Sequence, residues 1–294
     1  MSVLQPVAVS VENILVATDF SAASGKAARY AAGIARHFGS RMEIVHIFDP
    51  SVVTSYEEAI IAMPAVDRKQ ISDENLSCFV NNLHLEGIET SILATEGHRP
   101  ADALLEIAGE HQADLIVAGT EAKSGLARLI LGSTAEKVLR GATCPVLTVG
   151  PMARDPKPGP LAFKTIIYAT DFSPEAARAA MIALSFAQDS AAHLYCCCVL
   201  SLDDEGLRTR DDLQEGFGRR LREIVPESSY DWCTPESVIE YGDAAEQILR
   251  LAEKIDADLI VLGARRSSFW LTRVEGGLTA SLLARAKCPV LTIC

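Results

Sequence analysis

The chain has 294 residues, enough for two domains of ordinary size, and 49% of its residues are hydrophobic while 22% are charged. This balance indicates a globular protein, and the net charge of −12 argues against a general nucleic-acid binder, which must neutralise phosphates with Lys and Arg. No stretch approaches the roughly 18 apolar residues of a membrane helix, and the first residues lack the basic start of a secretory signal. We therefore expect a cytoplasmic protein that does not contact a membrane.

In chain order, apolar runs alternate with amphipathic stretches. The expected strands of the first half are residues 14–18, 42–48, 88–93, 113–119 and 145–149, and its expected helices are residues 21–38, 70–85, 100–111 and 133–140. This alternation predicts an open, doubly wound parallel sheet with helices on both faces. Such sheets bind ligands beyond the carboxyl ends of their strands, so Asp19, Asp49 and Gly119 are expected to meet there. The segment 51–64 is interpreted as a lid or a mobile loop.

The pattern occurs twice. NILVATDFS at 13–21 returns as TIIYATDFS at 165–173, ADLIVAGT at 113–120 returns as ADLIVLGA at 257–264, and CPVLTV at 144–149 returns as CPVLTI at 288–293. Three pairs in one order, displaced by 152, 144 and 144 residues, indicate an internal duplication. We predict domains at residues 1–150 and 161–294, joined by a Pro- and Gly-rich linker at 151–160.

The stretch GTEAKSGLARLILGST, Gly119–Thr134, carries the main functional signal. Gly132, Ser133 and Thr134 begin a helix, where unpaired N–H groups favour an anion. Gly119, which lacks a Cβ, allows either a close backbone approach to a ligand or a positive φ. The alternative interpretation is purely structural: Ser133 or Thr134 caps its own helix, and Gly119 makes a turn.

TDFS together with DLIVAGT…LGSTAEKVL…CPVLTV resembles the universal stress protein family, twice and across essentially the whole chain. The resemblance implies two Rossmann-like, adenine-nucleotide alpha hydrolase-like domains in tandem. The nucleotide-binding branch of that family carries G-x-x-G, nine residues, then G-[ST]. The first copy supplies Gly119, Gly132 and Ser133 but has Ala122 at the second glycine. The second copy has Gly263, Arg266, Gly276 and Gly277 at these positions, so only two of the four match.

The same resemblance implies roles for individual residues. Asp19 would bind the ribose, Ala17 and the backbone of Ile47 would border the adenine, and Gly119 would pass beneath the ribose and phosphates. The triphosphate of ATP, with Mg²⁺, would lie on the residues that open the helix, which are Gly132, Ser133 and Thr134, and near Ala122. The structural alternative for Asp19 is a cap on the helix that follows it.

Departures from the motif predict an asymmetric pair of sites. Ala122 weakens the first site if a positive φ is required there. Gly277 removes a hydroxyl from the second site, and Glu275 would compete with a phosphate for the helix N–H groups. We therefore expect ATP binding mainly in the first half. No catalytic constellation is apparent in the sequence, so hydrolysis, if any, is expected to be slow.

Two competing functions stay open at this level. The chain could be an interaction or chaperone-like stress module that has lost the nucleotide site, or a thiol sensor built on its eight cysteines, although Cys196, Cys197 and Cys198 are expected to face the core alternately. In the family that the sequence resembles, the final strands mediate pairing between domains. The two halves should then pack as an intramolecular pseudo-dimer, and a true homodimer and a protein partner remain undetermined.

Overall fold

The computed structural model describes residues 10–49, 65–121, 133–201, 210–263 and 277–293. The first half contains β1 (Asn13–Ala17), α1 (Ala22–Phe38), β2 (Arg41–Phe48), α3 (Ala65–Asn81), β3 (Thr90–Glu96), α4 (Pro100–Glu110), β4 (Leu115–Gly119), α5 (Ser133–Gly141) and β5 (Val146–Val149). The second half contains β6 (Thr165–Ala169), α6 (Pro174–Ser190), β7 (His193–Leu200), α7 (Arg210–Ile224), β8 (Thr234–Tyr241), α8 (Ala244–Lys254), β9 (Leu259–Gly263), α10 (Leu278–Arg285) and β10 (Val290–Ile293). The predicted segment 51–64 lies outside the described residues.

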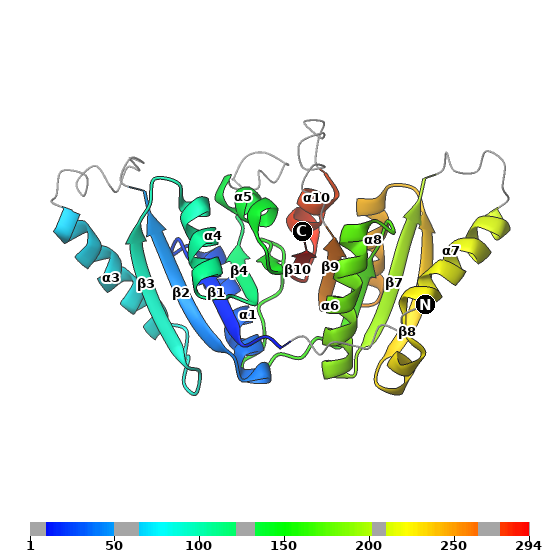
Figure 1. Ribbon diagram of the computed structural model, residues 1–294, viewed down its shortest axis with the longest axis horizontal. Helices are drawn as coiled ribbons and strands as arrows, with labels where there is room; N and C mark the ends of the chain where they lie inside the picture. Colours follow the sequence, from blue (N-terminus) through cyan, green and yellow to red (C-terminus); the bar gives the residue numbers. More distant parts are fainter. Residues whose placement is uncertain (1–9, 50–64, 122–132, 202–209, 264–276, 294) are drawn as a thin grey trace.

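The described strands form one ten-stranded sheet in the order β3-β2-β1-β4-β5-β10-β9-β6-β7-β8. Pairing is parallel within each half, which confirms the predicted doubly wound arrangement. At the centre β5 and β10 pair antiparallel, with Leu147 opposite Leu291. Figure 1 shows the two halves on either side of this pair. The final strands therefore join the halves into a pseudo-dimer, as the sequence analysis predicts. In the first half the strand order reverses between β1 and β4.

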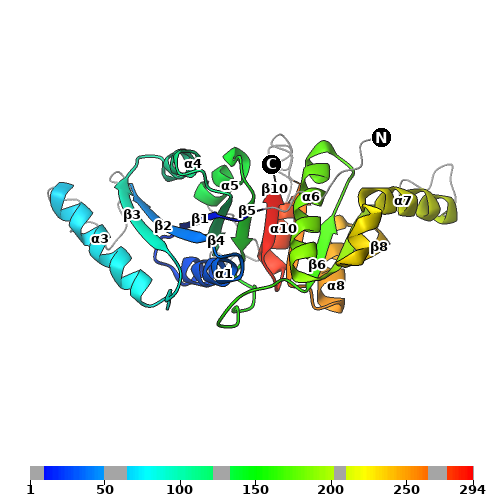
Figure 2. The same cartoon turned by 60° about the horizontal axis from the view of Figure 1, so that its bottom comes forward.

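Two helical layers enclose the sheet. Helices α1, α3, α6 and α7 pack on one hydrophobic core, and α4, α5, α8 and α10 pack on the other. Figure 2 shows α1 and α4 on opposite sides of the strands of the first half. Because successive strand residues face opposite cores, Cys196 and Cys198 lie in the first core and Cys197 in the second. The predicted alternation of these cysteines is confirmed.

The segment between β5 and β6 runs along α1. The ammonium of Lys26 donates to the carbonyl of Ala153 (2.6 Å), and the hydroxyl of Tyr30 donates to the carbonyl of Arg154 (3.0 Å). The N–H of Leu161 donates to the carbonyl of Gly33 (2.8 Å). These contacts fix the connection between the halves against the first helix.

A close approach between α1 and the end of β4 defines the ligand edge of the sheet. A Cβ added at Gly119 would lie 2.4 Å from the carbonyl carbon of Ala23, and one added at Gly263 would lie 2.3 Å from that of Glu175. Side chains cannot enter such a contact without moving the helix. Each half therefore requires glycine at this position for packing.

We predict that Gly119→Ala lowers the free energy of unfolding by about 2 kcal/mol, because the added methyl group must push α1 away from β4. The matched control is Gly109→Ala in α4, where an added Cβ meets no atom within 4 Å. Removing a helical glycine there should raise the free energy of unfolding by about 0.5–1 kcal/mol. Urea unfolding of both variants measures the difference, and equal effects would contradict the packing requirement.

Candidate functional site

The TDFS segment forms the same tight turn in both halves. In the first, the N–H of Phe20 donates to Oγ1 of Thr18 (3.0 Å) and the N–H of Ser21 donates to Oδ1 of Asp19 (3.0 Å). The corresponding bonds at Thr170 and Asp171 are both 2.9 Å. Phe20 and Phe172 adopt left-handed backbone conformations with φ of 63° and 60°. The repeated sequence thus encodes a repeated, strained turn at the end of the first strand of each half.

The helix after this turn begins with a side-chain cap. Oγ of Ser21 accepts the N–H of Ser24 (3.2 Å), as Oγ of Ser173 accepts the N–H of Ala176 (3.2 Å). The prediction that Ser21 caps the helix is confirmed. Asp19 lies just before the cap, and its Oδ1 accepts the N–H of Ser21. The interpretation of Asp19 as a helix cap therefore holds in part: Ser21 is the cap, and Asp19 stabilises the turn that leads into α1.

A pocket of about 220 Å³ opens at the carboxyl ends of β1, β2 and β4. Its lining includes five of the predicted site residues, which are Ala17, Asp19, Ile47, Gly119 and Thr134. The remaining lining combines apolar side chains with two hydroxyls: Thr18, Ser24, Val45, Pro100, Leu104, Ala118, Ala135 and Val138. The described residues thus supply an apolar wall with one carboxylate and the first turn of α5, as a ligand with an apolar ring and polar groups requires.

Three predicted site residues are not placed in this pocket. Ala122 and Gly132 lie outside the described residues, and for Ser133 only the backbone, as the first residue of α5, is described. Their predicted roles therefore stay predictions. One of the two alternatives for Gly119 is wrong: its φ is not positive, and its missing Cβ accommodates α1.

Sequence reasoning missed the residues that line the pocket from neighbouring elements. Ala118 precedes Gly119 in β4, so strand alternation alone predicts that the two residues face opposite sides of the sheet. Leu104 and Pro100 come from α4, and Val45 from β2, opposite Ala17 in the sheet. Their arrival at one place depends on strand register, which the sequence alone does not specify.

The carboxyl group of Asp19 is held in its ionised form. Partial burial by itself would raise its pKa, but hydrogen bonds from Ser21 and Ser24 outweigh this effect, and the pKa lies below its ordinary value of 3.8. Asp19 nevertheless remains exposed at the pocket. A negatively charged acceptor is therefore available there at neutral pH.

The aromatic ring of Phe20 holds the turn against β2. It packs on His46 with ring centroids 4.2 Å apart, and Nδ1 of His46 lies 2.9 Å from the carbonyl oxygen of Thr18. In the second half, Arg220 stacks over Phe172 at 3.9 Å from the ring centroid. The turn is thus conformationally fixed in both halves by different partners.

The second half repeats the backbone of the pocket but not its side chains. In the sheet register, Leu262 lies beside Ala169 as Ala118 lies beside Ala17. Leu262 is almost fully buried. At the start of the last helix, Leu278 replaces Thr134, which removes the hydroxyl. The buried side chain of Leu262 therefore stands where the first half has the much smaller Ala118, whereas Leu278 is exposed.

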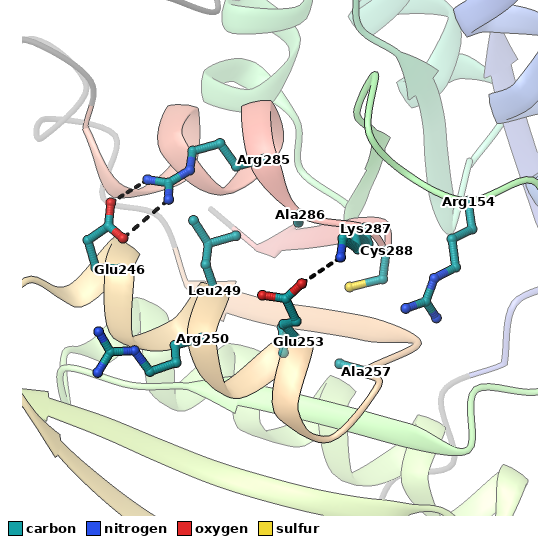
Figure 3. A pocket seen from close by; sticks show the side chains of 11 residues that line it. Arg154, Glu246, Leu249, Arg250, Glu253, Ala257, Arg285, Ala286, Lys287 and Cys288 are labelled. Carbon is teal, nitrogen blue, oxygen red and sulfur yellow. Dashed lines mark hydrogen bonds and ion pairs between the residues drawn. The ribbon is translucent and has the colours of Figure 1, made fainter.

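The second half has a different hollow, of about 250 Å³, between α8 and α10 (Figure 3). Arg285 forms ion pairs with Glu246, and Lys287 pairs with Glu253 at 2.6 Å. Such exposed pairs contribute little stability individually, but they link α8 to α10 and to the residues that follow α10. Cys288 also lines the hollow, and burial raises the pKa of its thiol to about 12.

The cysteines described by the structure are mostly unreactive. Burial raises the pKa of Cys196 and of Cys197 to about 12, so neither is a thiolate at neutral pH. Cys78 on α3 is exposed, whereas Cys294, the thiol expected to be exposed, lies outside the described residues. The triple cysteine is core packing and does not support the thiol-sensor alternative.

The described residues, which are 10–49, 65–121, 133–201, 210–263 and 277–293, contain neither a metal-binding cluster nor a membrane-spanning helix. These residues hold no group of three or more His, Cys, Asp or Glu side chains arranged to bind a metal. None of their helices is both long and apolar enough to cross a membrane. Within the pocket itself, Asp19 is the one carboxylate among the described lining residues.

Comparisons with known proteins agree with the duplication. The model of the universal stress protein family matches residues 10–150 and again residues 162–293. A universal stress protein of Methanocaldococcus jannaschii is 33% identical over 146 residues, which cover 47% of this chain and 81% of the relative. One from Thermus aquaticus is 33% identical over 138 residues, covering 47% of this chain and 98% of the relative. The crystal structure of a universal stress protein from Archaeoglobus fulgidus matches the fold with a TM-score of 0.71 at 19% identity, covering 96% of this chain and 97% of that one.

The lowered pKa of Asp19 generates a prediction for stability against pH. A carboxyl whose pKa is lowered on folding stabilises the protein above its unfolded pKa, and this stabilisation is lost as pH falls through the folded value. Asp19→Asn should therefore lower the free energy of unfolding at pH 7, and the difference from wild type should shrink below about pH 4. Urea unfolding between pH 3 and pH 7 measures it; a difference that does not vary with pH would show that the charge has no role.

Proposed function

Because this chain belongs to the universal stress protein family, we propose that it binds an adenine nucleotide, ATP in particular, in its N-terminal half and uses occupancy as a signal in stress adaptation. The observation that carries this proposal is the pocket at Asp19. An apolar wall, an ionised carboxylate and the start of a helix converge there at the reversal of strand order. The partial match to the nucleotide-binding motif of the family supports the same ligand.

In this proposal each wall of the pocket holds a different part of the ligand. Val45, Ile47 and Leu104 provide apolar surface for the base. Asp19, ionised and exposed, is an acceptor for ribose hydroxyls, and the first turn of α5 at Thr134 attracts the phosphates. At about 220 Å³ the pocket is smaller than the roughly 300–1,000 Å³ of a typical ligand site. The phosphates would therefore extend beyond it.

Mg²⁺ would enter with the nucleotide. Magnesium in nucleotide sites keeps several waters and is held largely by the substrate phosphates, and because Asp19 is proposed for the ribose, the ion would rest on the phosphates and water. The same composition supports slow or absent hydrolysis, because the described lining contains no second acid or base to activate water. We further propose that the protein acts in the cytoplasm as a nucleotide sensor with a protein partner still to be identified.

The ligand itself can be tested on purified protein. Denatured protein should release one adenine nucleotide, identified by absorbance at 260 nm and chromatography, and calorimetry with ATP should give one site per chain. Two equal ATP sites would overturn the predicted asymmetry. Absence of released nucleotide together with absence of binding would instead favour the interaction or chaperone-like module.

A second test of nucleotide binding introduces into the first half a leucine that the second half carries. Ala118→Leu places in the pocket the leucine that the second half has at Leu262, so it should abolish binding of adenosine and ATP without lowering the melting temperature. The matched control, Leu262→Ala, should leave the first site unchanged. Adenosine binding that survives in Ala118→Leu would place the ligand elsewhere.

A further inference from the structure

Helices α1 and α6, which belong to different halves, touch each other at their last turns. Nε2 of His37 contacts Oδ2 of Asp189, and the rings of Phe38 and Phe186 pack edge to face with centroids 5.6 Å apart. The side chains of His37 and Asp189 are 22% and 38% exposed, so their contact is partly shielded from solvent. None of these residues lines the pocket at Asp19, and the proposed nucleotide function does not use them.

His37 and Asp189 occupy equivalent positions in the duplication. Helices α1 and α6 begin 152 residues apart (174 − 22) and end 152 residues apart (190 − 38), and the same displacement leads from His37 to Asp189. The centre of the sheet shows the same relation, because Leu147 lies opposite its own counterpart, Leu291. Where counterparts face each other, the approximate two-fold axis that relates the halves passes between them. His37 and Asp189 therefore meet on this axis.

A contact on the axis would bring identical residues together if two like halves paired in the same geometry. Two first halves would place His37 against His37, so neither ring would meet a carboxylate. Two second halves would place Asp189 against Asp189, and two carboxylates repel each other. A carboxylate only accepts hydrogen bonds, so Nε2 of His37 is the donor in the observed contact. The pairing of unlike halves thus supplies one donor and one acceptor at this point.

The phenylalanine contact depends on unlike halves in the same way. At a displacement of 152 residues, the counterpart of Phe38 is Ser190 and the counterpart of Phe186 is Ile34. Two first halves would therefore set Phe38 against Ile34, and two second halves would set Ser190 against Phe186. The contact between two rings forms when unlike halves pair, and Phe163 extends it with a centroid 5.9 Å from that of Phe186.

The position of Asp189 on its own helix is unfavourable. Asp189 lies in the last turn of α6, where the partial negative charge of the helix end disfavours an acid, and that turn contains no basic residue. The last turn of α1, by contrast, contains Arg36 and His37. The ammonium of Lys164 donates to the carbonyl of Ser190 at the end of α6 (2.6 Å). His37 therefore supplies, from the other half, a favourable partner that α6 itself does not give Asp189.

We propose that the last turns of α1 and α6 form a recognition surface whose partner is the unlike half of this chain. The ring N–H of His37 and the carboxylate of Asp189 favour the pairing of a first half with a second half, and the phenylalanine contact adds to this preference. The central strands discriminate little, because their sequences, VLTV and VLTI, are nearly identical. The helices therefore carry the selectivity for unlike halves.

Substitutions in the intact chain can reproduce each like pairing. His37→Asp sets two carboxylates on the axis, as two second halves would, and should lower the melting temperature by roughly 2–4 °C. Asp189→His sets two imidazoles there, as two first halves would, and should lower it by less. Both native side chains are partly exposed, so neither change disturbs the core.

The swapped variant, His37→Asp with Asp189→His, restores unlike groups on the axis. Its melting temperature should recover most of the loss, because the donor and the acceptor have only exchanged sides. A swapped variant whose loss equals the sum of the two single losses would overturn the proposal, since the two side chains would then act independently.

A second test uses the sign of a single substitution. Removing an acid from the last turn of a helix normally stabilises that helix. Asp189→Asn should instead lower the melting temperature of the wild-type chain, and it should raise the melting temperature when His37→Ala is also present. Glu215→Gln is the control: Glu215 forms an exposed ion pair with Arg219 within α7 (3.2 Å), and its loss should have the same small effect in both backgrounds.

Equal effects of Asp189→Asn in the two backgrounds, of either sign, would overturn the proposal. These melting measurements use protein without added nucleotide. Their failure would therefore leave the proposed nucleotide function untouched, and a failure of nucleotide binding would leave the recognition surface untouched.

Discussion

The backbone contact between the start of α1 and the end of β4 determines where everything else at the ligand edge lies. A Cβ at residue 119 would stand 2.4 Å from Ala23, so glycine is needed before any ligand is considered. This contact places the turn at Asp19 and the first N–H groups of α1 beside the end of β4. The glycine that begins the nucleotide motif is thus first a packing requirement, and the pocket beside it follows from that packing.

The two halves share this backbone arrangement and differ in the side chains around it. Gly263 makes the same approach to α6, and Asp171 makes the same turn bond as Asp19. Leu262 and Leu278, however, stand where the first half has Ala118 and Thr134. A duplicated fold can therefore keep its turns, caps and glycines for stability in both halves while the space for a ligand remains in one. The asymmetry predicted from the loop motif has a second, independent basis in the strands.

The sequence was sufficient for the fold wherever local signals agreed. Helix α1 begins after the Ser21 cap and ends at Gly39, which has a left-handed φ of 72°, and both residues signal these boundaries. Helix α3 begins and ends earlier than the sequence predicts: the expected range is 70–85, and the helix spans Ala65–Asn81. Its sequence has little apolar periodicity from which the ends could be predicted. The pocket residues Val45 and Leu104 could not be assigned, because register and helix packing bring them together.

The ligand edge of the first half also borders the seam between the halves. Thr120 donates its N–H to Val149, the last residue of β5, and a Cβ at the following Gly150 would lie 2.1 Å from the carbonyl oxygen of Leu283 in α10. The end of β4 is thus joined to the second half through one hydrogen bond and one close backbone contact. Because packed interiors do not deform continuously, a group that shifts Thr120 must also shift either this strand end or α10. The second half is therefore linked to the ligand edge of the first through Val149 and Gly150.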